Sequence, residues 1–367
     1  MAAINTVHII GSKGLGGAER FFYRLATGLL HEGITATALV RAGSEVSEHT
    51  PKGLPKVELP MRTVWDPVSK FFIKRAIKAI APHVVQTYMG RATRLTRLKE
   101  GAFPVHVSRL GGYYKLDGYR HAHAWVGNTK GICDYLIRNG FPKEKVFHIP
   151  NFIEPRVTKA PEEAKEASRR DLGLPEDAWV LLSAGRFIPV KGHRYLLEAF
   201  LKMPDGIGGR PICLVLLGDG PLRGEYEKII GQGALSPKKR LIMPDWVNDP
   251  IPYFIASDLV IFPSLETETL GNVVLEAWAT MRPVIVTEFR GALEITRHKI
   301  DAYQVPCEDS GALERAMTEL LKDTSLREEM AMAGYERVID EFSRERIVGQ
   351  YVELYRELIR GVHSKWV

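Results

Sequence analysis

Three carboxylates surround a short apolar run late in the chain. The stretch is ETETLGNVVLEAWATMRPVIV, residues 266–286, and it contains Glu266, Glu268 and Glu276. Its spacing predicts a loop that carries Glu268 and turns into a helix, with Glu276 about one turn inside that helix. An unpaired charge on an apolar helix face is costly, so Glu276 is expected to meet a ligand or a polar partner. Glu266 is expected to be solvated.

The start of the same helix predicts an anion site. The backbone N–H groups near Asn272, Val273 and Val274 would have no partner within the helix and would attract phosphate. A carboxylate accepts two hydrogen bonds and suits a vicinal diol, at roughly 1.5–3 kcal/mol for each bond. One glutamate is therefore expected to hold a nucleotide's ribose and the other a sugar ring, with a diphosphate between them. The alternative is a helix-end charge for Glu268 and a solvated Glu276.

A second polar stretch, SAGRFIPVKGH, follows an expected strand over 179–185. It presents Arg186 and Lys191 beside Gly185 and Gly192. Two cations at the carboxyl end of a strand suit a diphosphate. A solvated basic loop is the alternative interpretation.

A glycine-rich turn, GSKGLGGAER, joins the first expected strand to the first expected helix. Glycines there let backbone N–H groups approach an anion at the positive end of a helix. The dinucleotide fingerprint is incomplete, because Glu19 stands where the third glycine belongs and the next strand ends at Arg41 instead of an acid. Arg41 leaves NADP open, and a tight turn without a ligand is equally compatible.

These polar stretches lie between expected strands and helices, which alternate in both halves of the chain. Strands are expected at 5–10, 34–40, 83–88, 104–110, 124–128 and 146–152, and then at 179–185, 212–218, 241–246, 259–264 and 283–288. Repeated strand–helix–strand units predict parallel sheets. The fold class is therefore α/β, with two Rossmann-like domains whose sheets face across a cleft.

The expected domains are 1–160 and 166–344, joined by a charged, proline-bearing linker over 153–168. A last helix, from about 345 to 367, is expected to pack back on the first domain. A chain of 367 residues is too long for one ordinary core, which supports two domains.

Composition restricts the class of protein. The chain is 45% hydrophobic and 26% charged, as in globular proteins, and no apolar run approaches the roughly 18 residues of a membrane span. The first residues lack the features of a signal peptide. Cys133, Cys213 and Cys307 have no metal-ligand spacing and are expected to be reduced thiols of a cytoplasmic protein.

Charge is divided unevenly between the halves. Residues 1–165 contain 25 Lys and Arg against 13 Asp and Glu, a formal charge of +12, and the remainder carries −6. Four of the cations, Lys70, Lys74, Arg75 and Lys78, alternate with apolar residues at helical spacing, and Arg91, Arg94, Arg97 and Lys99 follow. This pattern favours peripheral contact with anionic lipid or a phosphorylated acceptor. The alternative is a core-packed helix with a solvated basic face. No nucleic-acid partner is expected, because no RNA-binding signature accompanies the cations.

Several motifs together resemble one enzyme family. They are GGAER at 16–20, GRFIPVKG at 185–192, LGDGP at 217–221, and the two glutamates Glu268 and Glu276 followed by ATMRPVI at 279–285. In this order they resemble the retaining family 4 glycosyltransferases, which have the GT-B fold, from residue 7 to about residue 350. The resemblance implies sugar transfer from a nucleotide-diphosphate-sugar to a glycan or glycolipid, plausibly of lipopolysaccharide or another surface glycan, with no metal and no cofactor. A cytoplasmic enzyme, peripheral on the inner face of the membrane, is expected.

The resemblance also implies roles for individual residues. Glu276 is expected to hold the ribose, Glu268 the donor sugar, and Arg186 and Lys191 the departing diphosphate; Gly16 and Gly17 approach the sugar or phosphate, and Trp246 and Val247 contact the base. Two features depart from the family pattern. Glu268-Thr269-Leu270-Gly271 replaces the usual E-G-F-G after a loop one residue longer, and Gly111 and Gly112 stand where many members have a catalytic His. His106, a few residues earlier, is either a candidate for that role or a buried strand residue.

Two other functions compete with this interpretation. One is a nucleotide-dependent oxidoreductase on two Rossmann-like domains, against which the incomplete fingerprint argues. The other is a non-catalytic protein that binds a sugar nucleotide or a membrane, against which the retained charged residues argue.

Overall fold

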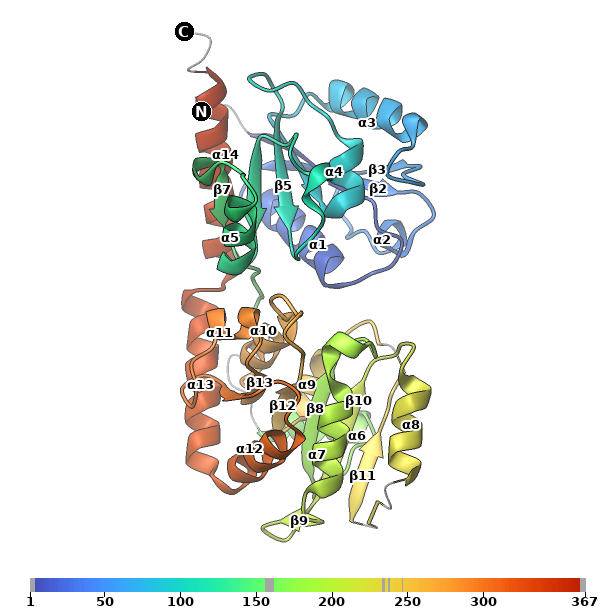
Figure 1. The fold of residues 1–367 in the computed structure, drawn as a ribbon, viewed down its shortest axis with the longest axis vertical. Helices are drawn as coiled ribbons and strands as arrows, with labels where there is room; N and C mark the ends of the chain where they lie inside the picture. The colour runs from blue at the N-terminus through green and yellow to red at the C-terminus, as the bar shows by residue number, and fades with distance from the viewer. Residues whose placement is uncertain (1–3, 156–161, 233–234, 237, 246, 364–367) are drawn as a thin grey trace. The chain divides into compact units, whose positions relative to one another are not determined.

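The computed structural model describes residues 4–155, 162–232, 235–236, 238–245 and 247–363. The chain divides into two units (Figure 1). Unit 1 comprises Met1–Phe152 and Arg344–Val367, and unit 2 comprises Ile153–Ser343. Part of the expected linker is a helix instead, because residues 162–168 begin α6 of unit 2.

Unit 1 is a parallel seven-stranded sheet in the order β3-β2-β1-β4-β5-β6-β7, with helices on both faces. Its strands are β1 (Asn5–Ile10), β2 (Thr35–Arg41), β3 (Lys56–Leu59), β4 (Val84–Tyr88), β5 (Val105–Leu110), β6 (Ala124–Gly127) and β7 (Val146–His148). Its helices are α1 (Gly17–His31), α2 (Glu45–Glu48), α3 (Pro67–Ile80), α4 (Met89–Leu95), α5 (Lys130–Arg138) and α14 (Arg344–His363).

The strands of unit 1 form because their apolar residues are buried on both faces of the sheet. On one face, Val7 and Ile9 of β1 pack in a cluster with Ile73 of α3. Ile10 lies in a second cluster with residues of α1 and α14. Strand β3 was missed from the sequence because KVEL is a half-exposed edge strand with two charged residues.

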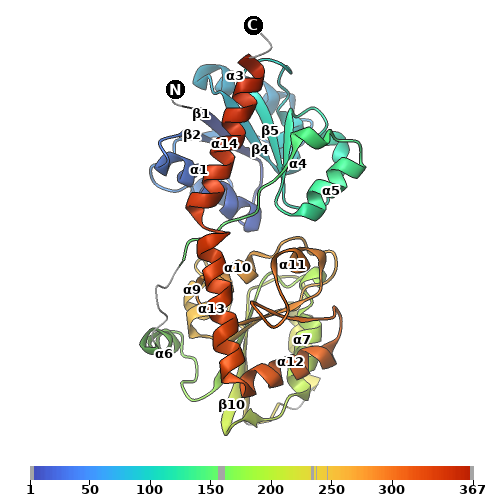
Figure 2. The ribbon, with the colours of Figure 1, turned by 90° about the vertical axis from the view of Figure 1, so that its left-hand side faces the viewer.

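The C-terminal helix α14 belongs to unit 1, although it follows unit 2 in the sequence. It lies beside α1 (Figure 2), and Tyr351 and Tyr355 are fully buried in the cluster that α1 also lines. The contact is close, since a Cβ added at Gly28 of α1 would lie 2.7 Å from Cγ2 of Val348. The expectation that the last helix packs on the first domain is in accord with this placement.

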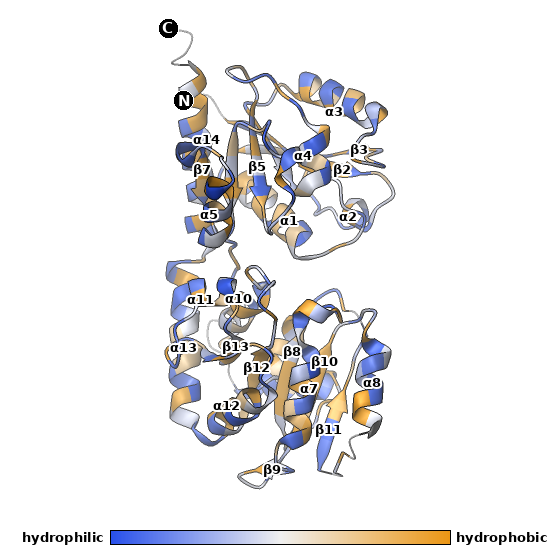
Figure 3. Cartoon of the chain, in the orientation of Figure 1, coloured by the Kyte–Doolittle hydropathy of each residue, from blue (hydrophilic) through white to orange (hydrophobic). Residues whose placement is uncertain are grey.

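Unit 2 has a second, mainly parallel sheet in the order β11-β10-β8-β12-β13-β14, with the short β9 antiparallel to β10. Its strands are β8 (Trp179–Ala184), β9 (Gly206–Ile207), β10 (Arg210–Leu217), β11 (Lys239–Ile242), β12 (Leu259–Phe262), β13 (Val284–Thr287) and β14 (Tyr303–Val305). Its helices are α6 (Glu162–Asp171), α7 (His193–Lys202), α8 (Arg223–Gln232), α9 (Ile251–Ala256), α10 (Asn272–Ala279), α11 (Arg290–Ile295), α12 (Ser310–Lys322) and α13 (Thr324–Asp340). The central strands β8 and β10 are drawn mainly in orange in Figure 3, as expected for parallel strands covered on both faces.

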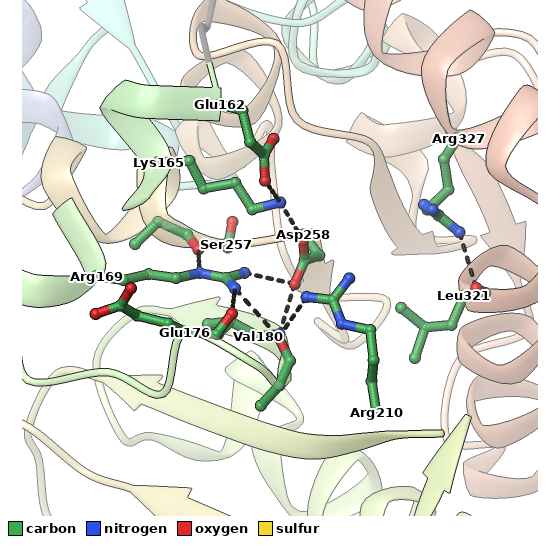
Figure 4. Close-up of polar contacts among 12 residues, drawn as sticks. Glu162, Lys165, Arg169, Glu176, Val180, Arg210, Ser257, Asp258, Leu321 and Arg327 are labelled. Carbon is green, nitrogen blue, oxygen red and sulfur yellow. Dashed lines mark hydrogen bonds and ion pairs between the residues drawn. The ribbon is translucent and has the colours of Figure 1, made fainter. Parts of the chain in front are cut away.

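Helix α6 is held to unit 2 by a buried ionic cluster (Figure 4). Both carboxylate oxygens of Asp258 form ion pairs, one with Nζ of Lys165 and the other with Nη2 of Arg169, each at 2.6 Å. The N–H of Val180 donates to the same carboxylate at 2.7 Å. Burial raises the pKa of Asp258, but the two cations outweigh it, so the pKa lies below its usual value. The cluster therefore ties the start of unit 2 to the amino ends of β8 and β12.

Each sheet reverses its direction of growth at one position. In unit 1 the chain builds outward from β1 to β2 and β3, and then from β4 on the other side of β1. In unit 2 it builds from β8 to β10 and β11, and then from β12 on the other side of β8. The loops after the two strands at such a position diverge, which leaves space for a ligand at the carboxyl edge of the sheet.

Candidate active site

Two loops at the switch point of unit 2 bring Lys191 and Glu268 together. Lys191 follows β8 and Glu268 follows β12, and these two strands are parallel neighbours. The Lys191 Nζ lies 2.6 Å from Oε2 of Glu268, and their side chains are 21% and 12% exposed. The same ammonium lies 5.1 Å from the ring centroid of Phe262. The structure thus places two of the predicted catalytic side chains in direct contact.

The Glu268 carboxylate is held by its own loop as well. Its Oε1 accepts the backbone N–H of Thr269 at 3.1 Å, and Ser264 Oγ lies 3.4 Å from Oε2. Ser264 is fully buried at the end of β12. Sequence reasoning missed Ser264, although its place at the carboxyl end of the expected strand 259–264 is the signal by which it could have been found.

Close backbone contacts define the shape of these loops. Gly192 has φ +62°, and a Cβ there would lie 1.9 Å from the carbonyl oxygen of Pro263. A Cβ at Gly291 would lie 1.3 Å from the oxygen of Thr269. Only glycine fits either position, so the Lys191 loop and the Glu268 loop are both pressed against neighbouring backbone. Gly291 was not predicted; a glycine shortly after the strand at 283–288 was the available signal.

The segment between β8 and α7 is not one continuous helix. Residues Pro189–Lys191 form a short 3₁₀ turn and α7 starts at His193. Left-handed Gly192 separates the two segments, because a right-handed helix does not continue through that conformation. Arg186 therefore lies in an open loop after β8, exposed to solvent. It does not share the ion pair of Lys191.

Helix α10 carries the predicted second carboxylate. Glu276 is half-buried at the fifth position of α10, between the buried Leu275 and Ala277. Among the described residues its carboxylate has no hydrogen-bond or ion-pair partner within contact distance. The N-cap is Gly271, with φ +69° and no side chain to cap the helix. The start of α10, where the helix dipole is positive, thus directly follows the loop that carries Glu268.

The residues predicted around this helix differ in their surroundings. Asn272 is half-exposed, and Val273 and Val274 are buried. The N–H of Val274 donates to the carbonyl oxygen of Gly271 at 3.2 Å, so the expectation that this N–H has no partner was wrong. Val247 is half-buried and packs on the core of unit 2. Trp246 lies outside the described residues. Glu266 is exposed and pairs with Arg290 at 3.0 Å, as a surface ion pair.

The glycine loop of unit 1 is occupied by the chain's own carboxylates. Gly16 is the N-cap of α1, and its N–H donates to Oε2 of Glu19 at 2.9 Å. The N–H of Leu15 donates to Glu45 at 3.1 Å. Gly17 is exposed at the first position of the helix. Of the two glycines expected to approach the sugar or phosphate, Gly16 therefore already has its amide bonded, and the contact of this loop with Glu45 was not anticipated from sequence.

His106 is the second residue of β5, and Gly111 directly follows the last residue of that strand. A Cβ at Gly111 would lie 3.6 Å from Nη1 of Arg109, an ordinary contact, so space does not require glycine there. His106 is fully buried, and its Nε2 lies 2.9 Å from Oγ1 of Thr87. Burial lowers the pKa of His106 well below its usual value, which keeps the ring neutral. His106 is thus the buried strand histidine of the two alternatives.

The second basic string does not form a uniform basic surface. Arg91 is half-buried, and its Nη1 donates to the carbonyl oxygen of Gly11 at 2.7 Å. Arg94 packs against Gly118, where an added Cβ would lie 2.1 Å from its Nε. Arg97 and Lys99 are exposed. The expectation of a surface basic helix was therefore wrong for Arg91 and Arg94, whose side chains contact other residues of unit 1.

Within the described ranges, no group of three or more His, Cys, Asp or Glu side chains is arranged to hold a metal ion. No helix in the described part of the chain is both long and apolar enough to cross a bilayer. The three cysteines are free thiols, two of them buried.

Comparisons with known proteins agree with the motifs. A family model for glycosyl transferases group 1 matches residues 164–337, and one for glycosyltransferase family 4 matches residues 15–157. The lipopolysaccharide core biosynthesis glycosyltransferase LpsE of Rhizobium meliloti is 31% identical over 352 residues, covering 92% of this chain and 95% of LpsE. LpsD of the same organism is 30% identical, covering 95% of this chain and 97% of LpsD.

Solved structures share the fold at low identity. Anabaena HepE in complex with UDP-glucose matches with a TM-score of 0.82 at 18% identity, over 96% of this chain and 100% of that one. WaaG, described as a glycosyltransferase involved in lipopolysaccharide biosynthesis, matches with a TM-score of 0.72 at 15% identity, over 96% and 99% of the two chains. Family models and relatives together show that this chain is a glycosyltransferase of family 4, with the GT-B fold.

Proposed function

We propose that this enzyme transfers a sugar from a nucleotide-diphosphate-sugar to a lipopolysaccharide core or related surface glycan, with retention of configuration and without a bound metal or other cofactor. The proposal for the acceptor is supported by LpsE and LpsD, whose names place them in lipopolysaccharide core biosynthesis. The contact between Lys191 and Glu268 at the switch point of unit 2 carries the proposal for the donor.

The donor's groups can be assigned by charge. The diphosphate binds at the uncapped start of α10, with Arg186 and Lys191 as its cations. Glu276 accepts hydrogen bonds from the ribose diol, since its half-buried carboxylate has no other partner among the described residues. Glu268 accepts hydrogen bonds from hydroxyls of the donor sugar while its ion pair fixes its orientation. In this proposal Gly17 and Gly111 of unit 1 contact the sugar or the acceptor, and Gly16 does so only where a ligand displaces Glu19 from its N–H.

The chemical step transfers a glycosyl group between oxygens. The bond from the anomeric carbon to the diphosphate breaks, and a bond to an acceptor hydroxyl oxygen forms on the same face. The proton of that hydroxyl passes to the departing diphosphate. Lys191 and Arg186 lower the barrier because negative charge accumulates on the diphosphate as it leaves, an effect of about 10² to 10³ in rate for one well-placed donor.

Two glutamine variants separate the roles of the glutamates. Glu276→Gln should weaken calorimetric binding of the bare nucleoside diphosphate, whereas Glu268→Gln should spare that binding and lower transfer. The opposite order would mean that the two roles are exchanged. Activity should also persist in EDTA, and complete loss that Mg²⁺ or Mn²⁺ restores would overturn the metal-free part of the proposal.

An acceptor in a glycolipid requires the enzyme to reach a membrane surface. We include in the proposal a peripheral contact with an anionic leaflet on the cytoplasmic side, through Lys70–Lys78. Lys74, Arg75 and Lys78 are exposed and Lys70 is half-exposed on α3. Cations close to an anionic surface attract it by about 1 kcal/mol each.

A further inference from the structure

Helix α3 and the turn before it expose an unusual set of apolar side chains. Trp65 is 71% exposed, Phe71 61%, Val68 53% and Phe72 39%. Large hydrophobic side chains are normally buried, and single exposed ones need no explanation. Four of them within eight consecutive residues do need one, because a clustered apolar patch marks an interaction surface.

The helix is fixed in place by other residues, so the patch is not needed for folding. Ser69, Ile73 and Ile77 are the buried residues of α3, spaced four apart on the side that packs on the sheet. Asp66 caps the helix, accepting from the N–H groups of Val68 and Ser69 at 3.0 and 3.3 Å. Val68, Phe71 and Phe72 lie outside that buried side of the helix and are exposed.

Trp65 is exposed for a specific reason. It lies just before the N-cap Asp66, at the position that usually packs against an apolar residue on the first turn. The residue at the matching position is Lys70, which offers no apolar partner. Trp65 therefore has no local contact of that kind, and its indole is left to the solvent.

Cations surround the apolar residues and decide the kind of partner. Lys74, Arg75 and Lys78 are exposed on the same helix, which has no acidic residue between Pro67 and Ile80. Hydrophobic and hydrophilic residues alternate along α3 in Figure 3. A soluble phosphorylated ligand would use the cations but not the four apolar side chains. An anionic bilayer interface satisfies both, since aromatic rings favour the headgroup level and lysines favour acidic lipids.

We infer that Trp65, Val68, Phe71 and Phe72 insert into the interface of an anionic bilayer, with the cations of α3 on the headgroups. This inference rests on the proposed function for the location of the acceptor, and it adds an apolar anchor to the purely electrostatic contact. The apolar part of the binding persists at high salt, where the Debye length falls to about 3 Å. The electrostatic part is lost there.

The test compares matched pairs of substitutions by vesicle flotation. The probe is a vesicle of phosphatidylcholine and phosphatidylglycerol in equal amounts, with phosphatidylcholine alone as the neutral lipid. Trp65→Ala with Phe71→Ala should lower the partition coefficient about tenfold for each ring, as estimated from half-immersion of an aromatic side chain. The control pair is Leu293→Ala with Ile300→Ala in unit 2, where the side chains are 49% and 51% exposed. It should bind as the parent protein does.

A second measurement locates Trp65 directly. Vesicles with brominated acyl chains should quench part of the parent's tryptophan fluorescence, and Trp65→Phe should bind equally well but lose that part of the quenching. Equal flotation of the parent and the Trp65, Phe71 double variant would overturn the inference. The inference would also be overturned if the parent sediments as a dimer without lipid and the double variant sediments as a monomer. The patch would then be an interface between copies of the chain.

Failure of the inference is distinguishable from failure of the proposed function. Slow hydrolysis of the nucleotide-sugar in the absence of acceptor depends on unit 2 and needs no vesicle. If hydrolysis occurs and the aromatic pair has no effect on flotation, only the membrane anchor is wrong. If no nucleotide-sugar is bound or hydrolysed, the proposed function fails whatever the vesicles show.

Discussion

Replacing Lys191 by Met removes a charge from the Lys191–Glu268 pair while keeping most of the side chain. The change should leave Glu268 without its cation, although the carboxylate retains the N–H of Thr269 and the hydroxyl of Ser264. The variant should therefore fold, but unit 2 should be less stable. Turnover should fall much further than stability suggests, since the same cation is proposed to act on the departing diphosphate.

The size of the stability loss follows from the exposure of the pair. Exposed ion pairs contribute about 0.2–1 kcal/mol, and breaking a fully buried pair costs about 3–5 kcal/mol. With side chains 21% and 12% exposed and a 2.6 Å contact, the Lys191–Glu268 pair lies between these limits. We expect a loss of about 2 kcal/mol, or about 4–8 °C in the melting temperature of a domain of this size. Turnover should fall by about 10² to 10³.

A double-mutant cycle with Glu268→Gln separates the pair from other effects. The two single variants and the double variant are compared by thermal melting and by rate of sugar transfer. If the pair is a real interaction, the double variant should lose less stability than the sum of the single variants, by about 1–2 kcal/mol. Additive losses would refute the reasoning, and so would near-normal turnover in Lys191→Met. The matched control is Arg186→Ala, because Arg186 is exposed in the loop and takes no part in the ion pair. This variant should lower turnover without lowering the melting temperature.

Three further predictions concern the framework of unit 2. Met281 has φ +52° just after α10, so Met281→Gly should raise stability by about 1 kcal/mol in thermal melting, and an unchanged or lower melting temperature would contradict this. Gly291→Ala should weaken nucleotide binding in calorimetry, because its Cβ would displace the backbone of Thr269 and the Glu268 loop; unchanged affinity would argue against that coupling. The folded pKa of Asp258 is lowered, so its contribution to stability is present above its ordinary pKa of 3.8 and is lost as pH falls through the folded value. Asp258→Asn should destabilise unit 2 at neutral pH and reduce the loss of melting temperature on acidification below about pH 4, whereas an unchanged acid profile would mean that Asp258 is not the titrating group.

Local pattern was enough to predict most of the strands, and the loop and helix that carry Glu268 and Glu276. Short apolar runs predicted β1, β8 and β12, because parallel strands buried on both faces read as continuous hydrophobic segments. The spacing of Glu268 and Glu276 predicted a loop that enters a helix, which is the observed order. Half-exposed edge strands such as β3 were missed, since they carry no such run.

The polar partners of the site were decided only by tertiary structure. Lys191 and Glu268 are 77 residues apart, and they meet because β8 and β12 are neighbours at the switch point of the sheet. The amides of the glycine loop looked available in the sequence but are bonded to Glu19 and Glu45, the second of which comes from another element. Such pairings depend on strand order, which the local sequence does not encode.

Burial separated residues that look alike in the sequence. Arg91 and Lys74 both belong to basic helical strings, yet Arg91 bonds the backbone of Gly11 inside unit 1 and Lys74 is exposed. Residue type alone was also a poor guide to exposure. The polar His106 is buried in a strand with a lowered pKa, whereas the apolar Phe71 is exposed on a helix. The sequence by itself predicted the buried strands and showed which residues carry charge. Only the packing of those segments decided which charges pair and which side chains remain outside, because each outcome depends on neighbours distant in the sequence.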